Sequence, residues 1–313
     1  MAAFVALLTL LGAGFDVFYV GAAGGAAPVG SIAALGLGSM SALASYLGGD
    51  RAVLAATRAR PLDDLIERAP AGIDRLKLAQ LQNVVDEMAI ASGLPRPPVY
   101  VVPDDDPNAF ATGRGPGHSS IAVTRGLLDA LDREELQGVV AHEMSHIRNL
   151  DVRLMTIVAA LAGAAALLSE WARRGMMWGD GPSRRDRNND RRGGAAGTAV
   201  LFAVWVVAIL VAPLVTQAMA MMVSRRREYL ADASGAELTR NPLGLARALE
   251  KIEAAVEPTP AINRGSAHLC IADPLGRPLN EREGRWADLF ASHPPMDKRI
   301  AALRAMAFVP GLP

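Results

Sequence analysis

The stretch VVAHEMSHIRN, from Val139 to Asn149, carries two histidines four residues apart, with a glutamate directly after the first. Upstream, Asp132 and Glu135 have the spacing of a capping box, which predicts that a helix begins there. Apolar residues then recur at helical spacing, at Leu136, Val139, Val140, Met144 and Ile147. The sequence therefore predicts that the two histidines lie on one amphipathic helix.

This helix has the pattern of a catalytic zinc site. Residues four apart share a helix face, so His142 and His146 direct their imidazoles to one point. Neutral imidazole is a good zinc ligand. Glu143 cannot bind the same ion in the same way, but it is placed to take a proton from a water that the zinc activates. H-E-x-x-H on a helix is typical of zinc proteases, although a helix can also carry these three residues by chance.

A catalytic zinc needs a third protein ligand, and a histidine six residues after the motif is excluded because Val152 stands there. The remaining candidates are carboxylates and the other histidines, His118, His268 and His293. The best candidates are Glu228 and Asp232, which would share one helix face. One would bind zinc while the other accepts a hydrogen bond from a ligand histidine. The alternative is a solvated acidic pair that balances the charges of Arg225–Arg227.

The composition points to a membrane protein. Of the 313 residues 51% are hydrophobic but only 5% aromatic, and the mean hydropathy is +0.21. The net charge of zero gives no support to nucleic-acid binding. Cys270 is the only cysteine, so no intramolecular disulfide can form, as fits a reducing compartment, and we expect a small buried apolar side chain there.

Four apolar runs interrupt the polar sequence, at residues 2–20, 31–47, 154–168 and 195–223. The first two predict a transmembrane hairpin, with a secretory signal as the alternative for the first. The third is short for a membrane span and the fourth is long enough. An Arg-rich, low-complexity insert, residues 172–194, separates the third run from the fourth.

Between these runs we expect a mainly α (α+β) fold, a zincin-type protease domain with a small β-sheet. Helices are predicted at 76–92, 242–255 and 296–306, strands at 97–103 and 120–124, and a loop between the strands. The expected organisation is a hairpin (1–49), a first protease half (50–152), a second apolar pair (153–223) and a second protease half (224–313).

Four motifs, in this order, resemble the HtpX family of membrane-bound zinc metalloproteases, which is related to the CAAX-prenyl proteases. They are PNAFATG (107–113), VVAHEMSHIRNLD (139–151), SRRREYLADASGAELT (224–239) and SHPPMDKRI (292–300). The resemblance covers nearly the whole chain, and only the Arg-rich insert and the abrupt apolar start look unusual for the family.

The resemblance implies one zinc ion per chain, bound by His142, His146 and Glu228, with Glu143 as the general base. Asp232 resembles the carboxylate that supports a ligand histidine in the family's E-x-x-x-D pattern.

Further roles follow from the same resemblance. His293 and Arg299 match a late catalytic motif, in which the histidine would stabilise the oxyanion. Alternatively, His293 only starts a helix and Arg299 is a solvated residue of it. Asn108 and Ala109 match a segment that holds substrate backbone in an extended pose, with a turn asparagine as the alternative.

The two apolar runs between His146 and Glu228 must both cross the membrane or both stay on one side, because both residues must reach one zinc. Arginines after the first hairpin, at 51, 58 and 60, predict a cytoplasmic protease domain. A spanning second pair would then carry the seven arginines of the insert outside, against the same rule. Either the second pair stays at the surface or packs within the protein, or the ligand constraint outweighs the charge bias.

We therefore expect a multi-pass endopeptidase of the cell (inner) membrane, facing the cytoplasm, with protein or peptide substrates. The resemblance implies that these are misfolded membrane proteins. The alternative is a non-catalytic membrane scaffold with a structural or vestigial zinc site, against which the presence of Glu143 argues.

Overall fold

The computed structural model describes residues 29–68, 74–156, 225–255, 270–271 and 294–307, together with Val5 and Thr9. Contacts divide the chain into two compact units, one of residues 1–47 and 161–217 and one of residues 48–160 and 218–313. All the site residues described below belong to the second unit.

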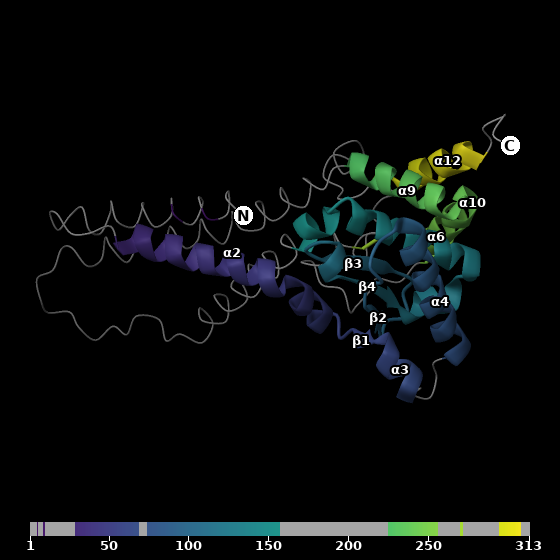
Figure 1. Cartoon of the computed structure of the whole chain (residues 1–313). Helices are drawn as coiled ribbons and strands as arrows, with labels where there is room; N and C mark the ends of the chain where they lie inside the picture. Colours follow the sequence, from purple (N-terminus) through teal and green to yellow (C-terminus); the bar gives the residue numbers. More distant parts are fainter. Residues whose placement is uncertain are drawn as a thin grey trace, which may run out of the picture. The chain divides into compact units, whose positions relative to one another are not determined.

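Helix α2 (Val29–Ala56) includes the apolar run 31–47 (Figure 1). Among the helices that the structure describes, none is both long enough and apolar enough to cross a bilayer. The runs 2–20 and 195–223, most of the run 154–168 and the Arg-rich insert lie outside the described residues, apart from Val5 and Thr9.

A four-stranded sheet with the order β1-β2-β4-β3 supports the second unit (Figure 1). Its strands are β1 (Arg60–Pro61), β2 (Val99–Val102), β3 (Ala109–Gly113) and β4 (Ser119–Thr124). Strands β2 and β4 run parallel, whereas β1 and β3 run antiparallel to their neighbours. The predicted strands 97–103 and 120–124 are confirmed as β2 and β4.

The predicted loop between these two strands is wrong, because it contains the edge strand β3. Its five residues are all buried, so the sequence shows no alternation of apolar and polar side chains. Ala109, Ala111 and Gly113 are also small residues with little strand preference. Turn residues on both sides of β3 made the whole stretch resemble a loop.

Both faces of the sheet are covered, since successive strand residues point to opposite faces. Ile121 and Val123 of β4 belong to the large core shared with the helices, while Ala122 between them belongs to a second, smaller cluster. Phe110 of β3, only 1% exposed, lies in the smaller cluster with Cys270, which is buried as predicted.

Helix α6 (Arg133–Arg148), which carries the H-E-x-x-H motif, is the centre of the second unit. The Asp132–Glu135 capping box is present: the Asp132 side chain accepts from the Glu135 N–H and the Glu135 side chain from the Asp132 N–H. Helix α6 contacts helices α4, α9 and α10 and strands β3 and β4 (Figure 1). Its ten consecutive residues from Gly138 to Ile147 are buried, so the motif lies in the protein interior.

The other helices confirm most of the predicted boundaries. They are α3 (Leu62–Arg68), α4 (Arg75–Ser92), α5 (Arg125–Ala130), α9 (Arg225–Thr239), α10 (Pro242–Ala254) and α12 (Met296–Ala307), with the 3₁₀ turn η3 (Pro116–His118). Helix α4 ends at Gly93, whose φ of 68° lets its N–H reach carbonyls of the last turn.

Candidate metal centre

Helix α9 brings two carboxylates against the motif helix α6. Its approach depends on Gly235, where an added Cβ would lie only 3.1 Å from the His142 backbone nitrogen. Glu228 and Asp232 lie on the face turned toward α6, and each is 1% exposed. The alternative of a solvated acidic pair is therefore wrong.

The side chains of His142, His146 and Glu228 converge on one point. Their ligand atoms all lie within 4.8 Å of one another. The two Nε2 atoms are 3.2 Å apart, and the Glu228 carboxylate oxygens lie 3.8 Å from His142 Nε2 and 3.7 Å from His146 Nε2. All three residues are at most 3% exposed.

This triangle fits a zinc ion. With metal–ligand bonds of about 2.0–2.1 Å, neighbouring ligands of a tetrahedral site lie about 3.3 Å apart. The fit is also chemical, because each histidine has a carboxylate beside its other ring nitrogen. A proton held there on Nδ1 leaves both Nε2 lone pairs directed at the same point, where a cation removes their repulsion.

Asp232 and Arg299 support His142 from behind. His142 Nδ1 lies 3.0 Å from Asp232 Oδ1. The Arg299 guanidinium donates to both oxygens of Asp232, at 2.8 and 2.7 Å, and to the Ile271 carbonyl at 3.0 Å. Burial raises the pKa of Asp232, but Arg299 and His142 outweigh burial and lower it to about 2.

Arg299 is itself fully buried, at 0% exposure, so the alternative of a solvated helix residue is wrong. Its Nη1 also lies 3.6 Å from Glu228 Oε2. Burial lowers the pKa of Arg299, but the charge of Asp232 and its hydrogen bonds raise it more. The guanidinium therefore stays charged and compensates the buried carboxylates.

Asp151 and Arg227 support His146, a contact that the sequence did not suggest. His146 Nδ1 hydrogen-bonds to Asp151 Oδ2 at 3.1 Å, and Arg227 Nη1 donates to Asp151 Oδ1 at 2.9 Å. Burial lowers the pKa of His146, but the hydrogen bond to Asp151 and the charge of Glu228 raise it to about 9. Burial likewise lowers the pKa of His142.

Glu143 lies beside these ligands and is 1% exposed. Burial and the charge of Glu228 raise its pKa to about 7, against the opposing effect of His146. The backbone N–H of Ala111 in β3 hydrogen-bonds to its carboxylate. A carboxyl group that exchanges a proton near neutral pH thus lies between the ligand set and the edge strand.

Asn108 and Ala109 lie at the start of this edge strand. Asn108 is fully buried; its side-chain oxygen accepts from the Ala109 N–H, and its backbone carbonyl accepts from the Thr124 N–H. The Ala109 carbonyl accepts from the Ile271 N–H. Asn108 is therefore a buried, hydrogen-bonded residue at the start of the strand that borders the site.

Of the remaining histidines, His118 alone is among the described residues. His118, in η3, is exposed and lies outside the group of convergent ligand atoms. His268 and His293 lie outside the described residues.

Two histidines of an H-E-x-x-H helix, a carboxylate from a second helix and a nearby edge strand together define the class of metallopeptidases. Comparison with known proteins agrees. The sequence pattern described as "Peptidase family M48" matches residues 75–307. The "Protease HtpX homolog" of Thermoanaerobacter pseudethanolicus is 46% identical over 226 residues, 72% of this chain and 71% of the relative. That of Ligilactobacillus salivarius is 39% identical over 306 residues, 98% and 95% of the two chains.

The chain belongs to peptidase family M48 and groups with its HtpX proteases; it is a metalloprotease. The resemblance seen in its four motifs is thereby confirmed. A solved structure, the crystal structure of S. mikatae Ste24p, shares the fold with a TM-score of 0.50 at 16% sequence identity. The likeness covers 96% of this chain but 63% of that one.

Proposed function

We propose that the chain is a zinc endopeptidase in which His142, His146 and Glu228 hold one zinc ion per chain. The observation that supports this most strongly is the convergence of their three ligand atoms within 4.8 Å, in the protein interior. Bound zinc supplies Lewis acidity, which lowers the pKa of water and polarises a peptide carbonyl.

Glu143 is the general base in this proposal. Its carboxylate takes the proton of the attacking water and passes it to the leaving amine. Its pKa of about 7 suits both steps, since a group must lose and regain the proton at the working pH. Its hydrogen bond from the Ala111 N–H keeps the carboxylate at the strand edge.

The substrate backbone extends along the outer edge of β3. The Thr124 N–H donates to the Asn108 carbonyl, so every second residue along β3 directs its backbone N–H and C=O away from β4: Ala109, Ala111 and Gly113. The Ala109 carbonyl already accepts a hydrogen bond from the Ile271 N–H, and the Gly113 N–H donates to Thr156 Oγ1 at 2.8 Å. Asn108 and Ala109 thus shape the edge. The Ala111 N–H is bonded to Glu143, so a substrate peptide would meet the edge next to Glu143 at the Ala111 carbonyl.

Arg299 and Asp232 act through His142 and Glu228 rather than on the substrate. Asp232 accepts the Nδ1 proton of His142, and Arg299 keeps Asp232 ionised. The role proposed for His293, stabilising the oxyanion, rests on the motif alone, as in the family resemblance.

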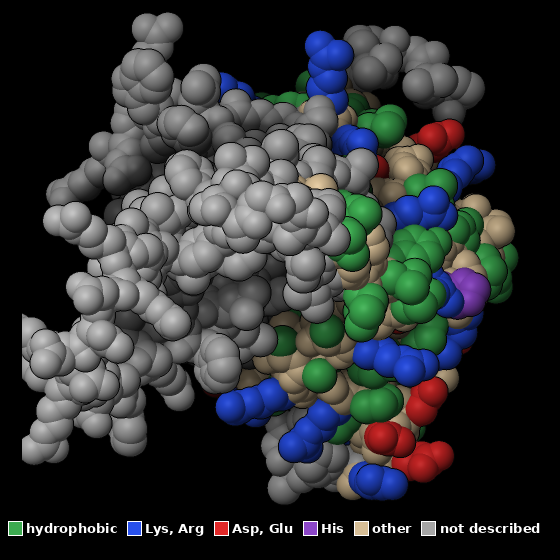
Figure 2. Space-filling model, turned by 90° about the vertical axis from the view of Figure 1, so that its left-hand side faces the viewer, with side chains coloured by type: hydrophobic (Ala, Val, Ile, Leu, Met, Phe, Trp, Pro, Cys, Tyr) green, Lys and Arg blue, Asp and Glu red, His purple; other side chains and the backbone are tan. Residues whose placement is uncertain are grey.

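We further propose a membrane-anchored enzyme whose site faces the cytoplasm and which removes misfolded membrane proteins. The apolar runs of the sequence and the arginines at 51, 58 and 60 support the location. On the described part of one face, Lys and Arg side chains lie beside hydrophobic ones, with Asp and Glu side chains among them (Figure 2). The HtpX resemblance supports the substrate class.

The test compares the full-length chain with its Glu143→Gln variant, both purified in detergent under chelator and then supplied with zinc. We expect the wild type to cleave casein only with zinc, and the variant to bind zinc equally but not to cleave. Cleavage by the variant would refute the role of Glu143. If both bind zinc and neither cleaves any protein substrate, the scaffold alternative would replace the proposed mechanism.

A further inference from the structure

Each of the two motif histidines is supported by an aspartate, and each aspartate by an arginine. On one side, Asp232 lies 3.0 Å from His142 and receives two hydrogen bonds from Arg299. We call each set of a histidine, its aspartate and its arginine a relay. The first relay is closed to solvent, since Arg299 is 0% exposed.

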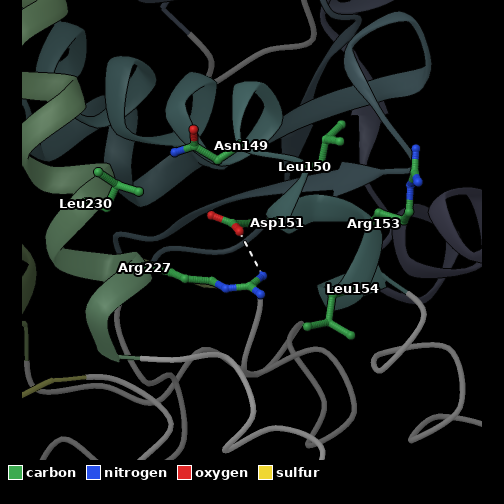
Figure 3. Close-up of a pocket in the computed structure, with 7 residues that line it drawn as sticks. All are labelled: Asn149, Leu150, Asp151, Arg153, Leu154, Arg227 and Leu230. Carbon is green, nitrogen blue, oxygen red and sulfur yellow. Dashed lines mark hydrogen bonds and ion pairs between the residues drawn. The ribbon is translucent and has the colours of Figure 1, made fainter.

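The second relay runs from His146 through Asp151 to Arg227. Its contacts are 3.1 Å and 2.9 Å long, and Asp151 is 4% exposed. Figure 3 shows Asp151 and Arg227 pointing toward one another from two chain segments, with Leu230 on the same helix as Arg227. The Arg227 side chain is 40% exposed, so this relay, unlike the first, reaches solvent.

Backbone geometry explains how Asp151 reaches His146. Helix α6 ends at Arg148, and Leu150 adopts a left-handed conformation with φ of 61°, which is unusual for a residue other than glycine. The chain therefore reverses within one turn and directs Asp151 back toward the ring of His146. An uncommon conformation at this position indicates that the surrounding structure holds it in place.

The second relay ends in a surface pocket. Asp151 and Arg227 line it together with Arg153 and Leu230, among others (Figure 3). Arg153 lines the same pocket but donates through Nε to the Arg114 carbonyl. It therefore provides a control for Arg227, with the same charge and in the same pocket but with no contact to Asp151 or His146 among the described contacts.

We propose that Asp151 and Arg227 are positioning residues of the metal centre. Asp151 holds the His146 ring with Nε2 directed at the metal, and Arg227 holds Asp151 from the pocket side. This inference rests on the proposed zinc site. It predicts that zinc affinity depends on Arg227, a side chain outside the protein interior. The size of the effect depends on how firmly this half-exposed ion pair holds the buried carboxylate of Asp151.

The experiment measures zinc affinity of the full-length chain in detergent by competition with a chromogenic chelator. Removal of a carboxylate that supports a ligand histidine weakens metal binding by about 10- to 100-fold, and we expect this for Asp151→Ala. Arg227→Gln removes a partly exposed ion pair, for which we expect about two- to fivefold. Arg227→Lys should recover much of that loss, and Arg153→Gln should bind zinc as the wild type does.

The double variant Asp151→Ala/Arg227→Gln separates positioning from general destabilisation. In this proposal Arg227 acts through Asp151, so its substitution should add nothing once Asp151 is gone. Equal losses from Arg227→Gln and Arg153→Gln, or an Arg227→Gln affinity equal to the wild type, would overturn the inference. If Asp151→Ala does not fold, the comparison of Arg227→Gln with Arg153→Gln still tests the proposal. A wild type that binds no zinc would instead refute the proposed function.

Discussion

Replacing Arg299 by methionine should destabilise the protein strongly. Arg299 is fully buried, contributes both hydrogen bonds between its guanidinium and Asp232, and lies 3.6 Å from Glu228. Methionine fills similar space but leaves a buried carboxylate without its countercharge. Breaking a buried ion pair in this way costs about 3–5 kcal/mol of unfolding free energy.

The matched control is Arg304→Ala on the same helix, α12. Arg304 also forms an ion pair, with Glu250 at 2.7 Å, but its side chain is 58% exposed. An exposed pair contributes about 0–1 kcal/mol. The two arginines thus differ in burial and in the number of their described contacts, and the comparison separates a buried ion pair from an exposed one.

The assay is thermal unfolding of the full-length chain in detergent, followed by circular dichroism, with zinc and with chelator. At about 2–4 °C per kcal/mol, Arg299→Met should lower Tm by about 6–20 °C and Arg304→Ala by less than about 4 °C. The loss should persist under chelator, because the stranded charge does not depend on zinc. A Tm shift for Arg299→Met no larger than that of Arg304→Ala would refute the reasoning.

Three further predictions concern packing and metal binding. Gly235→Ala should cost about 1–3 kcal/mol of unfolding free energy and weaken zinc binding, because its Cβ would push α9 away from α6. The control Gly117→Ala, with open space around it, should change neither Tm nor zinc affinity. Phe110→Ala should lower the unfolding free energy by about 3–5 kcal/mol in the same assay, since the ring is buried in the smaller cluster that includes Cys270. Chelation should lower the Tm of the wild type and of Glu143→Gln alike. Compared with zinc at 100 times Kd, the loss of unfolding free energy should be about 2.7 kcal/mol. An unchanged Tm would contradict a zinc site in the folded protein.

The motif helix was predictable in detail because its signals are local. The capping box, the apolar spacing and the two histidines all lie within α6, and no distant residue changes their arrangement. Helices α4 and α10 were predictable for the same reason. Strand β3 was not, because its burial on both faces depends on the helices and on the segment of Cys270 and Ile271.

For the site, the sequence could suggest candidate carboxylates but could not distinguish a buried pair from a solvated one. That distinction depends on the approach of α9 to α6 at Gly235, a contact between segments far apart in the chain. Asp151 ends the motif VVAHEMSHIRNLD, but its spacing suggested no contact with His146. Five residues is not a helical spacing, and only the left-handed Leu150 brings Asp151 to that ring.

The central claim is that one zinc ion is bound by His142, His146 and Glu228, and zinc K-edge X-ray absorption of the full-length chain tests it most directly. We predict a first shell of nitrogen and oxygen alone, at about 2.0–2.1 Å, with the outer-shell scattering of two imidazoles. The Glu228→Gln variant should hold less zinc after dialysis. A sulfur contribution near about 2.3 Å, which only Cys270 or a methionine could supply, or an imidazole count unchanged in His146→Ala, would contradict the account.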